Sequence, residues 1–188
     1  MSDNRHKIIL DLCGGTGSWS SPYAEAGYDV RVVTLPEQDV RLYEPPRRVR
    51  GVLAAPPCTY FCNMRNCRGV PTDEQLREGL AVVDACLRII CVSRPSWWAL
   101  ENPRGRLKRW LGLPVMKFNP YEFGDPWRKP TWLWGNFCPP MSRNMVEAKV
   151  GFVSSGWNES TRAAKCHTRE ARSVTPPGFA RAFFEANP

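Results

Sequence analysis

A glycine-rich turn between an apolar run and a helix-like segment is the feature that most constrains the fold. Residues 7–12 read Lys-Ile-Ile-Leu-Asp-Leu, the turn Cys-Gly-Gly-Thr-Gly follows at residues 13–17, and residues 20–26 can form a helix. Two further apolar runs, at residues 30–34 and 49–55, predict neighbouring strands. Strands joined through helices form parallel sheets that are covered on both faces. We therefore predict an α/β fold with a mostly parallel sheet and helices on both faces.

The remaining pattern predicts a core, an irregular insertion and a C-terminal segment. Apolar residues at helical spacing predict a long helix that begins after the N-cap residue Thr72 and ends before Pro95. Residues 97–100 and 131–134 are two more predicted strands. We expect a core over residues 1–135, a short irregular insertion over residues 136–171 and a C-terminal segment over residues 172–188.

Composition favours a soluble protein that binds a polyanion. With 188 residues, 43% of them apolar and 23% charged, the sequence fits one globular domain and excludes disordered, collagen-like and coiled-coil classes. It shows neither a secretory signal nor the roughly 18 consecutive apolar residues of a membrane span. The eight cysteines lack the spacing of secreted disulfide frameworks, so we expect free thiols in the cytoplasm. A net charge of +8 makes nucleic acid the first candidate partner.

Two reactive side chains stand at the ends of predicted strands. Cys58 follows two prolines at the end of the third strand, and Glu101 follows the fourth. The carboxyl ends of parallel strands meet at one edge of a sheet, so we expect the thiol and the carboxyl group to lie near the glycine-rich turn. Alternatively, Cys58 is a packing cysteine and Glu101 caps a surface turn.

The glycine-rich turn carries a family resemblance. Residues 11–20, Asp-Leu-Cys-Gly-Gly-Thr-Gly-Ser-Trp-Ser, resemble the first motif of the DNA cytosine-C5 methyltransferases, D-L-F-C-G-x-G-G-F-S, with departures at Cys13, Gly14 and Ser18. Residues 172–176, Arg-Ser-Val-Thr-Pro, resemble the last motif, which packs against the cofactor loop. The resemblance implies a Rossmann-like S-adenosylmethionine-dependent methyltransferase fold, with S-adenosyl-L-methionine as the cofactor. The implied cofactor contacts are Asp11, Gly15, Gly17, Asp39, Pro57 and Ser173.

Three further segments resemble the catalytic motifs of that family. Residues 57–61 are similar to P-C-x-x-F, residues 101–103 are similar to E-N-V, and residues 123–130 occupy the place of Y-G-x-P-Q-x-R-x-R. In this chemistry a thiolate adds to carbon-6 of cytosine and an acid protonates ring nitrogen-3, so that carbon-5 becomes nucleophilic. The implied roles are nucleophile for Cys58, acid for Glu101 and supporting cation for Arg128, with Lys129 as the rival cation.

The resemblance implies cytosine-containing DNA, duplex or single-stranded, as the partner. We also expect a bacterial or phage-like setting and a monomeric protein. The insertion is short for a target-recognition region, so we expect relaxed sequence recognition and mainly electrostatic affinity. Basic residues at 104–109 follow Glu101, where a target base would enter. Three alternatives stay open: an RNA cytosine methyltransferase, an inactive nucleic-acid-binding protein, and a substituted methyl donor. No metal is expected, although Cys62, Cys67, Cys138, Cys166 and His167 offer a weak zinc pattern.

Overall fold

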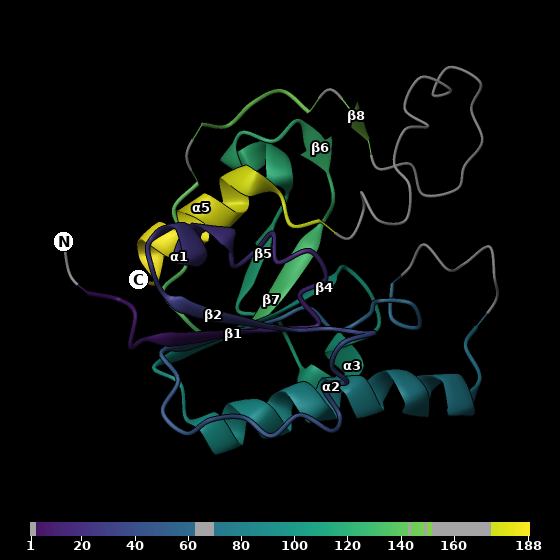
Figure 1. The fold of residues 1–188 in the computed structure, drawn as a ribbon. Helices are drawn as coiled ribbons and strands as arrows, with labels where there is room; N and C mark the ends of the chain where they lie inside the picture. The colour runs from purple at the N-terminus through teal and green to yellow at the C-terminus, as the bar shows by residue number, and fades with distance from the viewer. Residues whose placement is uncertain (1–2, 63–69, 143, 149, 152–173) are drawn as a thin grey trace.

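The structure is a computed structural model that describes residues 3–62, 70–142, 144–148, 150–151 and 174–188 (Figure 1). The described elements are β1 (Ile8–Leu12), α1 (Ser21–Glu25), β2 (Asp29–Val33), β3 (Gly51–Ala54), α2 (Asp73–Ser93), β4 (Trp97–Pro103), α3 (Lys108–Leu111), β5 (Met116–Phe118), the 3-10 helix η2 (Pro120–Phe123), β6 (Trp127–Arg128), β7 (Thr131–Asn136), β8 (Val150–Gly151) and α5 (Pro177–Ala186).

Six strands form one mixed, mostly parallel sheet in the order β2-β1-β3-β4-β7-β5. Strands β2, β1, β3 and β4 are parallel, whereas β7 runs antiparallel to both β4 and β5. Strands β6 and β8 pair separately. The predicted α/β fold class is confirmed, and the antiparallel strand β7 is a feature that the sequence pattern did not indicate.

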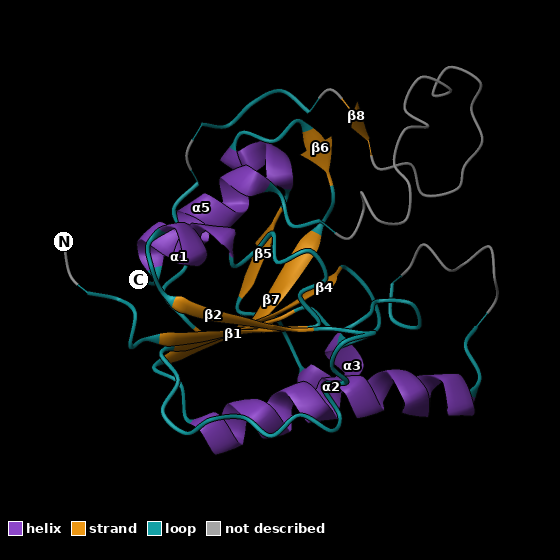
Figure 2. Ribbon diagram, in the orientation of Figure 1, coloured by secondary structure: helices purple, strands orange, loops and turns teal. Residues whose placement is uncertain are grey.

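Helices cover both faces of the sheet, as predicted. Figure 2 shows α2 and α3 on one side, and α1 and α5 on the other. The α2 side is mainly aliphatic and includes Val83, Ile89 and Leu100, while the α5 side is rich in aromatic rings. Phe118 stacks on Phe179 with ring centroids 3.9 Å apart, so α5 is held on the sheet through aromatic packing.

The long helix α2 begins and ends where the sequence predicted. The Gln75 backbone N–H donates to Thr72 Oγ1 at 3.3 Å, and the Thr72 N–H donates to Gln75 Oε1 at 3.2 Å. This reciprocal capping satisfies two of the unpaired donors at the first turn. The helix stops at Arg94, which has a left-handed conformation with φ 48°, directly before Pro95.

Strand β4 extends further than the sequence predicted. The predicted strand covered residues 97–100, but pairing with β7 continues to Pro103, opposite Thr131. Glu101 and Asn102 therefore lie within a paired strand. The elements α3, β5, η2, β6 and β8 each have four residues or fewer, too few for a periodic pattern. Within the described ranges, no helix combines the length and apolar character needed to cross a membrane. The domain boundaries predicted from sequence stay predictions.

Candidate active site

Cys58 stands at the start of a turn, and three residues separate it from the end of the buried strand β3. The backbone N–H groups of Phe61 and Cys62 both donate to the Cys58 carbonyl oxygen at 3.0 Å. We call residues 58–62 the nucleophile turn, after the role that the family resemblance implies for Cys58. The Asn102 amide nitrogen donates to the Pro56 carbonyl oxygen at 2.9 Å, and the Asn102 side chain is fully buried. This hydrogen bond ties the start of the turn to β4, so the two strand ends hold Cys58 in place.

Glu101 and Lys129 approach each other beside Cys58. Lys129 Nζ lies 4.0 Å from Glu101 Oε1, and each side chain is 17% exposed. The Arg104 backbone N–H donates to the Pro130 carbonyl oxygen at 2.9 Å, which holds the segment that carries Lys129 against the end of β4. Arg128, the cation carried over from the family motif, is exposed on β6. Of the two candidate cations, it is Lys129 that the structure brings to Glu101.

Burial and neighbouring groups raise the pKa of both acidic groups of the site. The contact with Cys62 raises the pKa of the Cys58 thiol far above its ordinary value, and burial and the Glu101 charge raise it further. Burial raises the pKa of Glu101 as well. The Lys129 ammonium opposes both shifts. The site therefore holds a protonated thiol next to a carboxyl group that takes up a proton more easily than an exposed glutamate does.

A glycine lets the chain after β4 approach the nucleophile turn. Gly105 pairs with Cys62 in an isolated bridge, and the Arg106 N–H donates to the Phe61 carbonyl oxygen at 2.7 Å. A Cβ atom on Gly105 would lie 2.1 Å from that same oxygen, so no other residue fits without a backbone shift. The sequence alone indicates no role for Gly105, and it indicates Asn102 only as part of the segment similar to E-N-V, although each stands within four residues of Glu101.

The glycine loop, residues 13–17, rests on a buried carboxyl group. Asp11 is fully buried, and Ser20 Oγ donates to its Oδ2 atom at 2.6 Å. A Cβ atom on Gly14 would lie 2.4 Å from the Asp11 carboxyl carbon. Burial raises the pKa of Asp11 to about 6, against the opposing effect of the Ser20 hydroxyl. Asp11 thus supports the loop from beneath, and its Oδ1 atom has no hydrogen-bond partner among the described residues.

The glycine loop is open to solvent at Gly15, and the residue that follows the loop, Ser18, contacts the C-terminal segment. Gly15 and Gly17 have φ values of +55° and +71°, and a Cβ atom on Gly15 would meet nothing within 4 Å. The Thr175 N–H donates to Ser18 Oγ at 2.9 Å. Pro57 is exposed at the same edge of the sheet. Ser173 lies outside the described residues, so its predicted cofactor contact stays a prediction.

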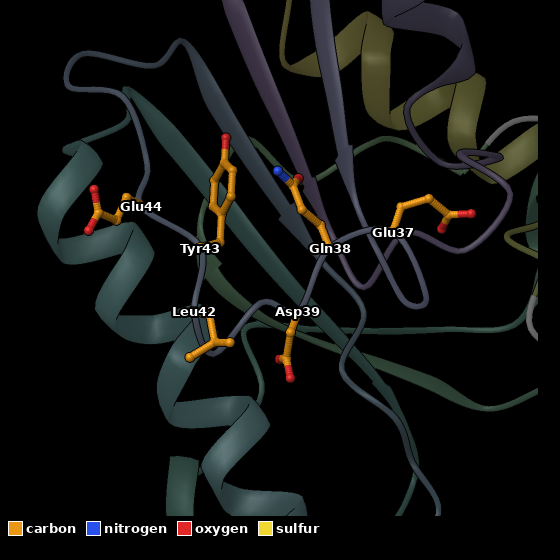
Figure 3. A pocket seen from close by; sticks show the side chains of 6 residues that line it. All are labelled: Glu37, Gln38, Asp39, Leu42, Tyr43 and Glu44. Atoms are coloured by element: carbon orange, nitrogen blue, oxygen red, sulfur yellow. The ribbon is translucent and has the colours of Figure 1, made fainter.

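A hollow of about 380 Å³ follows strand β2 and is lined by Glu37, Gln38, Asp39, Leu42, Tyr43 and Glu44 (Figure 3). In Figure 3 the side chains of Asp39 and Leu42 point to the opposite side of the segment from those of Gln38 and Tyr43. The Asp39 carboxylate accepts hydrogen bonds from the Arg41 backbone N–H at 2.9 Å and from Arg41 Nε at 3.0 Å. Arg41 holds the pKa of Asp39 below its ordinary value, so this carboxylate is ionised and already paired.

Comparison with known proteins identifies a viral relative. No protein-family model matches the chain. Over 208 residues the chain is 29% identical to the "Probable DNA (cytosine-5)-methyltransferase" of Frog virus 3 (isolate Goorha), across 91% of this chain and 95% of the viral protein. The chain is a distant homologue of that protein. This homology agrees with the resemblance that the motifs indicated.

A solved structure gives a second, weaker similarity. It is described as a "putative DNA modification methyltransferase encoded within prophage" from E. coli, with 17% sequence identity and a TM-score of 0.48. The match covers 69% of this chain and 46% of that one, so the chain spans less than half of the solved protein. Within the described residues, no group of three or more His, Cys, Asp or Glu side chains could hold a metal ion. Cys67, Cys166 and His167 lie outside those residues.

Proposed function

We propose that this protein transfers a methyl group from S-adenosylmethionine to carbon-5 of cytosine in DNA, through a covalent bond between the Cys58 sulfur and carbon-6 of the ring. The convergence of Cys58, Glu101 and Lys129, at the edge of the sheet that also carries the glycine loop, supports the proposal most strongly. A thiol, a neutral acid and a cation are the groups that this chemistry requires. Homology to a probable DNA (cytosine-5)-methyltransferase supports the same reaction.

The residues around the glycine loop fit the methyl donor. The open side of Gly15 and the positive φ angles of Gly15 and Gly17 leave room for a close approach to the backbone. The hollow beside Asp39 suits the adenine end of the methyl donor. The Asp39 carboxylate would then accept a hydrogen bond from the adenine in addition to those from Arg41. S-adenosylmethionine, when bound, supplies an electrophilic methyl group. Residues that would hold it are Gly15, Gly17, Asp39, Pro57 and Ser173, with Asp11 supporting the loop from beneath.

The catalytic residues act through proton movements that match their surroundings. Cys58 gives its proton to solvent, and the thiolate forms a bond to carbon-6 while the electron pair of the carbon-5–carbon-6 double bond shifts between carbon-5 and carbon-4, so that the pair of the carbon-4–nitrogen-3 double bond moves onto nitrogen-3. Glu101 in its neutral form donates a proton to ring nitrogen-3, which makes that addition favourable. After carbon-5 has been methylated, a water molecule takes the carbon-5 proton and the electron pair of that C–H bond re-forms the double bond. The bond between carbon-6 and sulfur breaks at the same time, so that Cys58 leaves as a thiolate, and nitrogen-3 returns its proton to Glu101. Lys129 favours the thiolate because its charge lowers the pKa of Cys58.

The substrate base must reach Cys58 outside a base-paired stack. Cys58 is half-buried at the strand edge, and a cytosine within a duplex could not contact its sulfur. The proposal therefore requires single-stranded DNA or an extruded base. The short insertion and the net charge of +8 favour binding through phosphates over the reading of a long sequence.

The direct test is product analysis on three polymers. The protein is incubated with isotopically labelled S-adenosylmethionine and with single-stranded DNA, duplex DNA or tRNA, and the nucleosides are separated by mass spectrometry. We expect labelled 5-methylcytosine from DNA. Label in tRNA alone would replace the proposal with an RNA methyltransferase. Binding to every polymer without label in any of them would support an inactive nucleic-acid-binding protein.

A further inference from the structure

Three strands place one tryptophan beside one lysine on the α2 side of the sheet. Trp132 on β7 lies opposite Asn102 on β4 and opposite Lys117 on β5. Residues in register on neighbouring strands project from the same face. Lys117 Nζ lies 5.7 Å from the centroid of the Trp132 ring, which is half-buried. The indole therefore holds an exposed ammonium group at the edge of the sheet.

A second lysine reaches the same ring from α3. Lys108 Nζ lies 5.8 Å from the Trp132 centroid, and the Lys108 side chain is exposed. No ion pair joins Lys108 or Lys117 to a carboxylate of the described residues. Two ammonium groups close to one ring concentrate positive charge at this part of the surface, which attracts an anion. We call Lys108, Lys117 and Trp132 the lysine–tryptophan surface.

This surface is connected to the nucleophile turn through a short stretch of chain. Gly105 pairs with Cys62, the Arg106 N–H bonds to Phe61, and Lys108 follows two residues later. Asn102, which pairs with Trp132 across the two strands, donates to the Pro56 carbonyl oxygen two residues before Cys58. Arg106 Nη1 is buried and has no hydrogen-bond partner among the described residues, which adds a cation between the turn and the surface.

We propose that the lysine–tryptophan surface binds the phosphate backbone of the nucleic-acid strand next to the target cytosine. The inference rests on the proposed function for its choice of substrate. A strand that placed its base at Cys58 would continue past Arg106 onto Lys108 and Lys117. Charge complementarity favours this occupant, because neither ammonium group of the surface pairs with a carboxylate of the described residues and the whole chain has a net charge of +8. The surface contributes affinity without reading sequence.

The test removes both charges and measures the salt dependence of binding. Fluorescence anisotropy with a labelled 20-nucleotide cytosine-containing DNA, single-stranded or duplex, gives Kd at several NaCl concentrations. The test variant carries Lys108→Gln and Lys117→Gln. The matched control carries Arg47→Gln and Arg94→Gln, which remove the same charge from exposed residues that precede β3 and β4, at the opposite edge of the sheet.

The logarithm of the association constant falls as the logarithm of the salt concentration rises. Loss of two phosphate contacts should make this slope less negative by about 1.4 on single strands and by about 1.8 on duplex DNA. Affinity at low salt should fall tenfold or more, and the control should change much less. In transfer assays the KM for DNA should rise while kcat stays within about twofold, because Cys58, Glu101 and Lys129 are intact.

Equal slopes in the test variant and the wild-type protein would overturn the inference. So would a loss of binding confined to vesicles of phosphatidylserine and phosphatidylcholine, which would assign the surface to a membrane. The methyl-transfer reaction is judged separately. If the slopes of the wild-type protein and the variant differ but the wild-type protein forms no 5-methylcytosine, the proposed function is contradicted and the phosphate-binding role of the surface still holds.

Discussion

The glycine loop and the nucleophile turn lie at the same edge of the sheet, but different forces hold them. The glycine loop rests on the buried pair Asp11 and Ser20 and on the absence of a side chain at Gly14. In the nucleophile turn, backbone hydrogen bonds fix the chain while Cys62, Glu101 and Lys129 set the pKa of Cys58. Substitutions of the residues that support the glycine loop should therefore change folding stability. Substitutions around the nucleophile turn should change the reactivity of Cys58.

The largest effect is expected at Glu101. Glu101→Gln removes the proton that the proposed mechanism delivers to ring nitrogen-3, so methyl transfer should fall by about 10² to 10⁴-fold. Stability should change by only about 1 kcal/mol, because the amide is neutral and close in shape to the buried carboxyl group and the 4.0 Å contact with Lys129 is a weak one. Steady-state transfer assays and urea unfolding measure the two effects. The control is Glu74→Gln, an exposed carboxylate on α2. Wild-type activity in Glu101→Gln would remove this residue from the mechanism.

The second effect concerns stability and pH at the glycine loop. The pKa of Asp11 is about 6 in the folded protein and 3.8 as its ordinary value. Between these values the folded state binds more protons than the unfolded state, so the free energy of unfolding decreases as pH rises from about 4 to 6, by up to about 3 kcal/mol. Asp11→Asn should lack this decrease and be more stable above pH 6.

Urea unfolding at several pH values between 4 and 8 checks the Asp11 prediction. The amide oxygen of Asn can still accept the Ser20 hydroxyl, so the variant keeps the contact and loses only the charge. Asp29→Asn is the control, because Asp29 is partly exposed and pairs with Arg31 at the surface. The same pH dependence in Asp11→Asn and in wild-type protein would mean that Asp11 does not titrate in this range.

The third effect concerns Cys62. Its contact is the largest cause of the raised pKa of Cys58, so Cys62→Ala should lower that pKa. The rate of Cys58 alkylation by iodoacetamide at pH 7.5 should rise by about tenfold for each unit of decrease, because the thiolate is the reactive species. Peptide mass spectrometry follows the modification, with Cys91→Ala on α2 as the control. A slower or unchanged rate would show that Cys62 does not restrain Cys58.

The smallest effect compares the two neighbouring cations. Lys129→Gln removes a charge that lowers the pKa of both Cys58 and Glu101, so both values should rise. Cys58 alkylation should then begin at higher pH and be a few-fold slower at pH 8. Arg128→Gln should leave the alkylation profile unchanged, because Arg128 is exposed on β6. A larger shift for Arg128→Gln than for Lys129→Gln would restore the assignment that the family motif implied.

The sequence predicted the parts of the site that depend on strand ends. Parallel strands deliver their carboxyl ends to one edge, so a cysteine after β3 and a glutamate on β4 had to lie near the glycine loop. The capping residue Thr72 marked the start of α2 in the same way, because its hydrogen bonds are local.

The parts that the sequence did not predict depend on contacts between segments. The choice of Lys129 over Arg128 follows from a two-residue strand and from the Arg104–Pro130 hydrogen bond, neither of which leaves a periodic signal. The need for Gly105 arises only where its backbone meets Phe61. The pairing of Asp39 with Arg41 is local but depends on a turn geometry that a lone Asp-x-Arg sequence does not specify.

The most direct test of the account is covalent trapping on DNA that contains 5-fluorocytosine. The fluorine replaces the proton that must leave carbon-5, so the bond between the enzyme and carbon-6 persists after transfer. With S-adenosylmethionine present, we predict a denaturation-resistant protein–DNA adduct for the wild-type protein and for Cys62→Ala, and none for Cys58→Ala. An adduct that forms equally well with Cys58→Ala would contradict the assignment of Cys58 as the nucleophile.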